Sequence, residues 1–306
     1  MLKKANLIVY MGGPSDIKEI KPFLYRLFSD RDLINFGVPE FLQKPLAYII
    51  ATIRSKKVAP NYQAIGGSSP TVKYAIEIAK AVEEITGVKT FTGMLYSAPL
   101  LKEVAAEIKD YGATEIAAIS LYPHYSFATA GACIRDVKKH FKNAKTVKSW
   151  CRNPHYITWI RKQLENSLKN TKNPFILFSA HSLPAYLIER GDPYIKEIED
   201  TVSLVMKGLD IPFSISYQSK VGPIKWLEPA TEEVIEKLGK EGIKELVVFP
   251  ISFISEHIET LFELDVEYRE VAEKAGIEKY IRVPLNHRDK DLITAISQEC
   301  QKLLRG

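Results

Sequence analysis

The sequence predicts an α/β protein made of two similar halves, each a parallel sheet flanked by helices. Short apolar runs rich in β-forming residues alternate with longer amphipathic stretches along the 306-residue chain. The short runs are continuously apolar, as is typical of parallel strands that helices cover on both faces. In addition, part of the pattern occurs twice at a fixed offset.

The strands follow from the short apolar runs. In chain order they include Leu7–Met11, Lys89–Leu95, Glu115–Leu121, Thr146–Trp150, Phe175–Ser179, Phe213–Tyr217 and Glu245–Ile251. Helical patterns lie between them. In the helix predicted within residues 69–87, we expect Ser69 to cap the start, Pro70 to occupy the first turn and Gly87 to end it.

The internal repeat has an offset of 130 residues (229 − 99). It matches five identical residues and several apolar positions, so that a helix, a Gly-x-x-Glu step and a strand occur twice. The identical pairs are Pro99 with Pro229, Glu103 with Glu233, Val104 with Val234, Gly112 with Gly242 and Glu115 with Glu245. The apolar pairs are Ile108 with Leu238, Ile116 with Leu246 and Leu121 with Ile251.

We place the first half at residues 1–160 and the second at residues 161–306, with the division somewhere in residues 150–173. The C-terminal helix can still pack back on the first half. In such folds ligands bind where the carboxyl ends of the strands open into a cleft, so side chains just after the strands are the candidates for function.

Composition excludes several classes of protein. The 42 Lys+Arg and 37 Asp+Glu residues give a net charge of +5, well short of a strongly basic nucleic-acid binder. The three cysteines, Cys133, Cys151 and Cys300, are far apart, which argues against a disulfide framework and fits a reducing compartment.

The apolar runs indicate a soluble, cytoplasmic protein. The first residues, MLKKANLIVYMGGP, lack the long apolar stretch and the cleavage site of a secretory signal. The apolar run at residues 46–53 is also far shorter than the roughly 20 residues that cross a bilayer.

His181 is the first candidate for chemistry, because it follows the apolar run at residues 175–178 and precedes Pro184. A neutral imidazole at a strand end could accept a proton or bind a borderline metal ion. It could equally be a histidine hydrogen-bonded within its own turn.

A line of glutamates after the last predicted strand is the second candidate. If Ser255 caps a helix there, five glutamates fall within an arc of about 80° at 100° per residue: Glu256, Glu259, Glu263, Glu267 and Glu270. They could bind a cation, or they could be the solvated face of an amphipathic helix.

Two aromatic or glycine-containing loops are weaker candidates. Trp226, beside Gly222-Pro223, could stack on a flat ligand or could cover the helix that starts near Pro229. The turn at residues 11–14, MGGP, lacks the third glycine of a dinucleotide fingerprint and the Gly-Lys of a phosphate loop.

Residues 33–60 combine apolar side chains with Arg54, Lys56 and Lys57. Such a segment suits a membrane interface or an apolar dianionic ligand, but also a core helix with a basic end. We expect His124, which follows a strand in the first half, to be structural.

Several long motifs in this order resemble the ferrochelatase family, whose enzymes insert ferrous iron into a porphyrin to make haem. The resemblance covers nearly the whole chain. The motifs are MGGP at residues 11–14, LFSDRDLI at 27–34, IGGSSP at 65–70, LYPHYS at 121–126, FSAHSLP with RGDPY, QSKVGPIKWLEPAT and SEHIETLFELDVEY. It implies two flavodoxin-like (Rossmann-like) halves around a porphyrin cleft.

The resemblance also implies roles for single residues. His181 and Glu259 match the family's iron-site residues, and Glu263 and Glu267 match an acidic line that runs from this site toward the surface. The substrate-binding positions are Met11, Arg54, Tyr125, Ser219 and Trp226.

The expected reaction is insertion of Fe2+ into protoporphyrin IX with release of two protons, with no organic cofactor. Leu95 stands where many relatives have an arginine, which puts one propionate contact in doubt, whereas Met11 favours protoporphyrin over coproporphyrin. Three scattered cysteines also indicate that the iron–sulfur cluster of some relatives is absent. Alternatives are a coproporphyrin or cobalt chelatase of the same fold and a non-catalytic tetrapyrrole or metal carrier.

Overall fold

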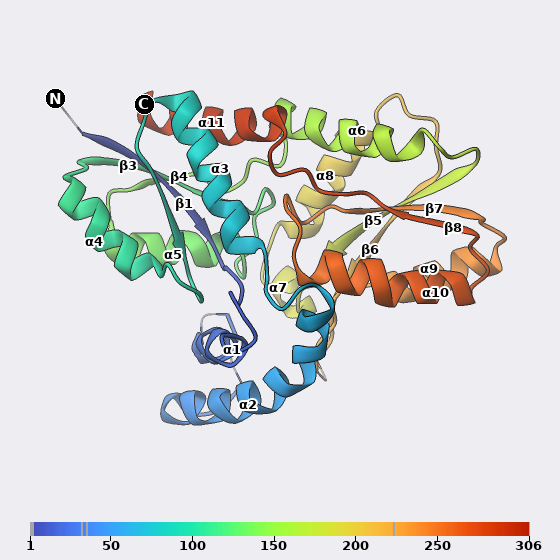
Figure 1. Ribbon diagram of the computed structural model, residues 1–306, viewed down its shortest axis with the longest axis horizontal. Coiled ribbons are helices and arrows are strands. Elements are labelled where there is room, and N and C mark those ends of the chain that lie inside the picture. Colours follow the sequence, from blue (N-terminus) through green and yellow to red (C-terminus); the bar gives the residue numbers. More distant parts are fainter. Residues whose placement is uncertain (1–2, 32, 35, 223, 306) are drawn as a thin grey trace. The chain divides into compact units, whose positions relative to one another are not determined.

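The computed structural model describes residues 3–31, 33–34, 36–222 and 224–305 (Figure 1). Asn35, within the apolar segment, and Pro223, within the predicted Gly-Pro loop, lie outside the described residues. The chain forms two compact units. The first holds residues 3–122, 126–149 and 293–305, and the second holds residues 123–125 and 150–292.

Unit 1 is built on a four-stranded parallel sheet in the order β2-β1-β3-β4. Its strands are β1 (Lys4–Tyr10), β2 (Thr90–Met94), β3 (Glu115–Ser120) and β4 (Lys145–Thr146). Its helices are α1 (Ile20–Ser29), α2 (Glu40–Ala64), α3 (Thr71–Thr86), α4 (Leu101–Tyr111) and α5 (Ala130–His140). The last helix of the chain, α11 (Lys290–Arg305), belongs to this unit from Ile293 onward.

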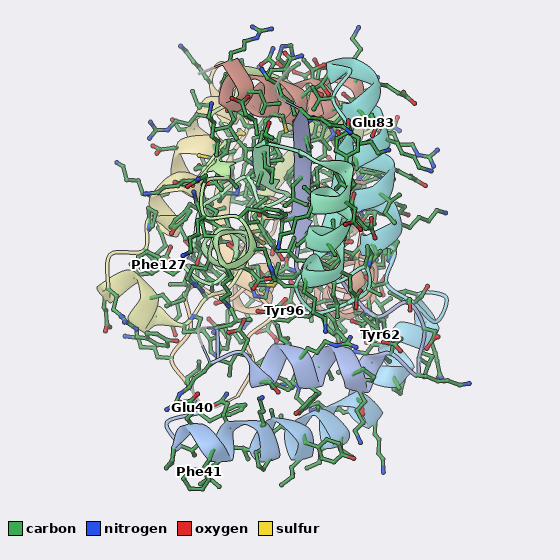
Figure 2. The ribbon with its side chains drawn as sticks, turned by 90° about the vertical axis from the view of Figure 1, so that its left-hand side faces the viewer. Glu40, Phe41, Tyr62, Glu83, Tyr96 and Phe127 are labelled. Carbon is green, nitrogen blue, oxygen red and sulfur yellow. The ribbon has the colours of Figure 1, made fainter. Side chains whose placement is uncertain are left out.

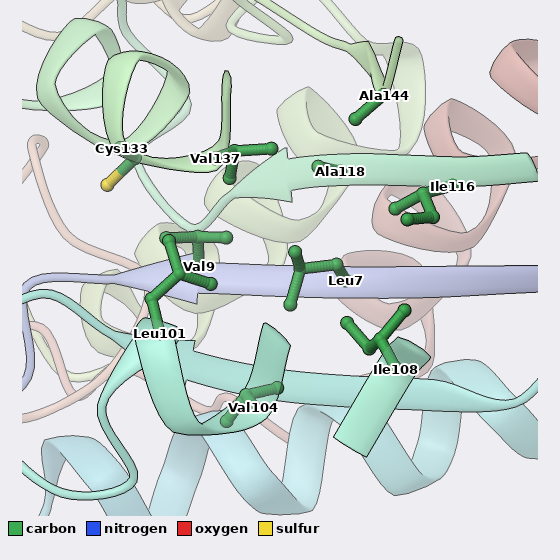
Figure 3. Close-up of a cluster of buried hydrophobic side chains, with 10 residues drawn as sticks. All are labelled: Leu7, Val9, Leu101, Val104, Ile108, Ile116, Ala118, Cys133, Val137 and Ala144. Atoms are coloured by element: carbon green, nitrogen blue, oxygen red, sulfur yellow. The ribbon is translucent and has the colours of Figure 1, made fainter. Parts of the chain in front are cut away.

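One face of this sheet carries a compact core beneath α4 and α5 (Figure 3). Leu7 and Val9 point from β1 to the same face, because alternate residues of a strand share a face, and they meet Leu101 and Val104 of α4. Figure 1 shows α3 on the other side of the sheet. Helices therefore cover both faces, which explains why the strands are continuously apolar.

Unit 2 repeats this plan with the strand order β6-β5-β7-β8, again all parallel. Its strands are β5 (Pro174–His181), β6 (Phe213–Gln218), β7 (Glu245–Pro250) and β8 (Lys279–Arg282). Its helices are α6 (Pro154–Leu168), α7 (Ala185–Glu189), α8 (Tyr194–Met206), α9 (Thr231–Lys240), the π-helix η1 (Glu259–Glu267) and α10 (Tyr268–Lys274).

The predicted fold class and the internal repeat are both confirmed. The two sheets have equivalent strand orders, and α4 and α9 occupy the same place in their units. The matched pair Ile108 and Leu238 lies in the two equivalent cores. Gly112 and Gly242 both adopt positive φ just after those helices, a conformation that glycine adopts at little cost. The expected boundary at residue 160 falls inside α6, all of which lies in unit 2.

Two local predictions were wrong, and one strand was missed. Only Lys145–Thr146 forms a strand where we expected one at Thr146–Trp150, and the edge strand β8 was not predicted. The N-cap residue of α3 is Pro70 rather than Ser69, although the Ser69 hydroxyl accepts a bond from the Thr71 N–H at 3.4 Å. Short edge strands such as β4 and β8 carry too few residues to show a sequence period.

The segment at residues 33–60 is mostly the helix α2, which packs against α1 through Ala47 and Ala51. The opposite side of α2 is apolar and exposed, with Phe41, Leu42, Tyr48, Ile49 and Ile53 on its surface. Figure 2 shows Phe41 at the outer edge of this helix. The segment is therefore not the fully packed core helix that one interpretation of the sequence offered.

Candidate active site

His181 is the last residue of β5, at the carboxyl edge of the sheet of unit 2. Its backbone is held on both sides: its N–H donates to the Ser252 hydroxyl at 2.9 Å, and its carbonyl accepts from the Tyr194 hydroxyl at 3.0 Å. Tyr194 Oη and Ser252 Oγ are themselves 2.6 Å apart. These contacts fix the direction in which the imidazole leaves the sheet.

The imidazole of His181 forms a close pair with Glu259, the first residue of η1, with Nδ1 2.8 Å from Oε2. Burial lowers the pKa of His181, but the adjacent carboxylates of Glu259 and Glu263 outweigh it and raise that pKa above its ordinary value. Conversely, burial raises the pKa of Glu259, and the charge of His181 together with its hydrogen bond lowers it well below the usual range. Each group thus makes its partner's charged form more favourable, which makes His181 a stronger base than an isolated imidazole.

Glu259 Oε2 collects further donors from the end of β6. The Ser219 hydroxyl lies 2.8 Å away, and the Gln218 amide nitrogen lies 3.4 Å away. The Gln218 side chain is in turn held by the Ser179 hydroxyl, which donates to its Oε1 at 2.6 Å. The carboxylate is thus oriented by side chains from two neighbouring strands.

Glu263, one turn further along η1, contacts the same serine. Its Oε1 accepts from the Ser219 N–H and from the Tyr268 hydroxyl, each at 2.8 Å, and its Oε2 lies 2.5 Å from Ser219 Oγ. Burial and the charge of Glu259 raise the pKa of Glu263 to about 7.

The number of protons available at Ser219 also indicates that the pKa of Glu263 is raised. A hydroxyl carries one proton, yet Ser219 Oγ is within hydrogen-bond distance of both Glu259 and Glu263. Both contacts are hydrogen bonds when Glu263 is protonated and donates to Oγ while Oγ donates to Glu259. In that arrangement the serine connects a protonated Glu263 to an ionised Glu259.

The glutamate ladder is only partly as expected. Ser255 does not cap the helix, because η1 begins only at Glu259. Just before this start, the Thr260 hydroxyl accepts from the His257 N–H and donates to the His257 carbonyl. Glu256 instead forms an ion pair with Arg282. Glu267 is still on η1, and burial with the charges of Glu232 and Glu270 raises its pKa.

The remaining predicted site residues are divided between the two units. In unit 2, the Tyr125 N–H donates to Glu197 Oε2 at 2.6 Å, and Trp226 donates through Nε1 to the Val221 carbonyl at 3.1 Å. In unit 1, Met11 follows β1, and the Arg54 guanidinium lies 5.9 Å from the centre of the Phe28 ring. Burial lowers the pKa of Arg54.

His124 is buried in unit 2, with Nε2 2.9 Å from Thr201 Oγ1, and burial lowers its pKa to about 3. This neutral, enclosed imidazole fits the structural role that we expected.

Among the described residues, no group of three or more His, Cys, Asp or Glu side chains is arranged to enclose a metal ion. The site instead offers one imidazole and one carboxylate at a strand edge, with a second carboxyl beside them. Imidazole and carboxylate groups of this kind can bind a divalent metal ion or exchange protons.

Comparison with known families decides the identity. The profile described as Ferrochelatase matches residues 3–303, which is nearly the entire chain. The chain belongs to the ferrochelatase family. It is therefore a lyase of haem biosynthesis for which iron is a substrate.

Individual ferrochelatases are similar over almost the whole length. The chain is 42% identical to the ferrochelatase of Gloeothece citriformis over 95% of this chain and 80% of that protein. It is 41% identical to the ferrochelatase of Aquifex aeolicus over 96% of this chain and 97% of that protein.

Solved structures place the fold among chelatases. The sirohydrochlorin chelatase SirB of Bacillus subtilis, in complex with cobalt, matches with a TM-score of 0.59 at 10% identity, over 99% of this chain and 96% of that one. DR2241 of Deinococcus radiodurans matches with a TM-score of 0.52 at 6% identity, over 98% of this chain and 55% of that one. At these identities the likeness concerns the fold alone.

Sequence reasoning missed several side chains that shape this candidate site. Ser252 and Tyr194 hold the His181 backbone, Gln218 and Tyr268 hold the carboxyl groups, and His257 places Nε2 3.8 Å from Glu259 Oε1. Burial lowers the pKa of His257. For His257, its position two residues before Glu259 was the one feature of the sequence that could have indicated a place in the site. The others become visible only when strands distant in sequence lie side by side.

Proposed function

We propose that this ferrochelatase inserts Fe2+ into protoporphyrin IX to form protohaem, releasing two protons, and that His181 and Glu259 carry the step. The observation that supports the proposal is the 2.8 Å contact of Glu259 Oε2 with His181 Nδ1. When Nδ1 carries a proton and donates it to the carboxylate, the lone pair of Nε2 is free to accept a pyrrole proton.

The acidic side chains next to the histidine suit the other half of the reaction. Carboxylate oxygens and an imidazole nitrogen are ligands that a divalent iron ion accepts. In the proposal Glu259 meets the ion with His181, and Glu263 and Glu267 form the line along η1 by which ions or protons pass. Ser219 supports this line by hydrogen bonding to both Glu259 and Glu263. In the proposal it therefore orients these two carboxyl groups, in place of the porphyrin contact expected from the sequence.

Substrate contacts are proposed for Met11, Arg54, Tyr125 and Trp226. Arg54 is the group suited to a porphyrin carboxylate, because guanidinium groups bind carboxylates through two parallel hydrogen bonds. We expect no organic cofactor, and no iron–sulfur cluster, because the three cysteines are all buried and four thiolates are the usual cluster ligands.

We also propose a cytoplasmic enzyme that touches a membrane through residues 33–60. The support is the exposed apolar side of α2, which includes Phe41, Ile49 and Ile53, followed by the exposed Lys56 and Lys57. Among the described residues, no helix is long and apolar enough to cross a bilayer. Sedimentation with anionic vesicles tests the contact, and Phe41→Asp with Ile49→Asp should abolish it.

Anaerobic incubation with Fe2+ and either free-base porphyrin tests the reaction. We expect many equivalents of haem per enzyme with protoporphyrin IX. Faster metallation of coproporphyrin, or of porphyrin with cobalt, would change the substrate assignment, and formation of at most one equivalent would identify a carrier.

Substitutions test the site. His181→Ala and Glu259→Gln should abolish insertion while porphyrin still binds, and Glu267→Gln should have a milder effect. His155→Ala is the matched control and should retain activity, because His155 is a partly exposed histidine paired with Asp291. Near-normal turnover of His181→Ala would remove His181 from the mechanism.

A further inference from the structure

Arg282, the last residue of β8, forms ion pairs with Glu256 and Asp265, and we call this group the ionic clamp. The Arg282 side chain is only 8% exposed. Its Nε and Nη2 donate to the two carboxylate oxygens of Asp265, at 3.1 and 2.5 Å, while Nη1 donates to Glu256 Oε1. This is the bidentate geometry that a guanidinium forms with a carboxylate.

The clamp joins two points that bracket the proposed iron-site residues. Glu256 precedes η1, whereas Asp265 lies within it, nine residues later (265 − 256). Glu259 and Glu263 lie between these points and contact His181 and Ser219. Glu256 Oε1 also accepts from the Leu285 N–H at 2.8 Å, which ties the start of the segment to the chain after β8.

Tyr280 reinforces the clamp from the same strand. It lies two residues before Arg282 and so projects from the same face of β8. Its hydroxyl donates to the Leu264 carbonyl at 2.8 Å. Arg269 closes the arrangement, with Nε donating to the Asp265 carbonyl at 3.0 Å and Nη1 to the Tyr280 carbonyl at 3.2 Å.

A support of this kind is needed because η1 is a π-helix of nine residues. Hydrogen bonds from residue i to residue i+5 are rare, and they occur mostly as single turns within α-helices. A longer stretch therefore depends on contacts outside the helix. Relaxation toward an α-helix would change the rotation per residue and move Glu259 and Glu263 relative to His181 and Ser219.

We propose that Arg282 is a positioning residue for metal insertion, which, with Tyr280, holds η1 in its wide form so that Glu259 stays against His181. The inference rests on the proposed function, because it concerns the same site. Arg282 itself touches neither the porphyrin nor the iron in this proposal and acts through Asp265 and Glu256.

The test compares Arg282→Gln, Arg282→Lys and Tyr280→Phe with the whole wild-type protein in anaerobic porphyrin metallation. We expect Arg282→Gln to lower kcat at least about tenfold, with the porphyrin KM within about twofold of wild type. The kcat of Arg282→Lys should be intermediate, because lysine keeps the positive charge but cannot donate two parallel hydrogen bonds to one carboxylate. Tyr280→Phe removes a single hydroxyl and should lower kcat about threefold.

Glu245→Gln is the matched control. Glu245 Oε2 accepts from the backbone N–H groups of Lys172 and Asn173, at 2.6 and 2.7 Å, and Glu245 lies at the start of β7, away from the carboxyl edge of the sheet. This variant should lower Tm without lowering kcat at a temperature where it is folded. The comparison separates general destabilisation from loss of positioning.

The proposal is overturned if folded Arg282→Gln keeps wild-type kcat, or if Glu245→Gln loses as much kcat for an equal loss of Tm. If Arg282→Gln does not fold, the same comparison of kcat and Tm is made with Tyr280→Phe and Asp265→Asn. Wild-type kcat in both folded variants would then overturn the proposal. Absence of metallation by the wild-type protein would instead refute the proposed function. The two failures are therefore distinguishable.

Discussion

At the scale of single residues, Ser219 organises the acidic part of the site. It has a φ of 67°, in the left-handed region that non-glycine residues seldom adopt. In this conformation its N–H reaches Glu263 and its hydroxyl reaches both Glu259 and Glu263. Strained backbone of this kind tends to occur at functional sites, where the surrounding contacts maintain it.

We predict that Ser219→Ala lowers kcat for iron insertion about tenfold, because the charged Glu259 loses a hydrogen-bond donor. Ser219→Gly is the companion variant, since it also lacks the hydroxyl but adopts positive φ easily. Steady-state metallation and thermal unfolding of both variants measure the effect. Full activity in either folded variant would show that the hydroxyl has no catalytic importance.

The raised pKa of Glu263, about 7, makes stability depend on pH. Between its ordinary pKa and about pH 7, this carboxyl is protonated when folded and ionised when unfolded. The free energy of unfolding therefore falls as pH rises through this window, by up to about 1.4 kcal/mol per pH unit for one proton.

Glu263→Gln should flatten this fall, because the amide does not titrate. Denaturant unfolding at pH 5 and pH 8 measures the difference between the two conditions. Glu236→Gln, on the exposed side of α9, is the control and should leave the wild-type slope unchanged. An equally steep loss of stability in Glu263→Gln would contradict the assignment of the proton.

At the scale of elements, α9 and the end of α10 approach closely at Gly239. A Cβ atom there would lie 2.3 Å from the Ala275 carbonyl oxygen and 2.6 Å from the Ala275 Cβ. Backbone cannot move aside as a flexible side chain can. The glycine thus permits the contact between helices that seat η1 and α10 on the sheet.

We predict that Gly239→Ala destabilises the protein by about 1–3 kcal/mol through overpacking. This outweighs the gain of about 1 kcal/mol that alanine brings to a helix interior. Lys240→Ala, at the exposed neighbouring position, should stay within about 0.5 kcal/mol of wild type. Urea unfolding measures both variants, and a more stable Gly239→Ala would show that α10 moves away freely.

The elements also show which predictions a sequence supports. The long apolar strands were predicted because burial on both faces leaves a continuous apolar run. Four-residue β8 contains Lys279 and Arg282, and it was missed because an edge strand needs no such run. The π-helix was also missed. The spacing of its glutamates resembles an α-helical face, whereas its geometry depends on side chains from β8.

At the scale of the whole molecule, each unit encloses its cysteines. Cys133 and Cys300 belong to unit 1 and Cys151 to unit 2, and all three are buried. Burial raises the pKa of Cys133 and of Cys300 to about 12 in each case. Little thiolate, the reactive form, is therefore present on Cys133 and Cys300 in the folded protein.

We predict that a thiol reagent modifies almost none of the cysteines of the native protein and all three after unfolding. Spectrophotometric titration in the absence and presence of denaturant counts them. Cys151→Ser serves as the control and should lower the denatured count by one. Rapid modification of the native protein would show that one unit opens under native conditions.

By itself, the sequence determined the two α/β halves, their repeat, and His181 at a strand end. These follow from hydrophobic periodicity and turn residues, which are local properties of the chain. The family resemblance also named Glu259 beside His181, and only the tertiary structure decided which other groups meet this histidine. The order β6-β5-β7-β8 brings Ser219, Ser252 and Glu259 to one sheet edge from as far as 78 residues away. Such pairings depend on strand order and helix geometry, which no local pattern encodes.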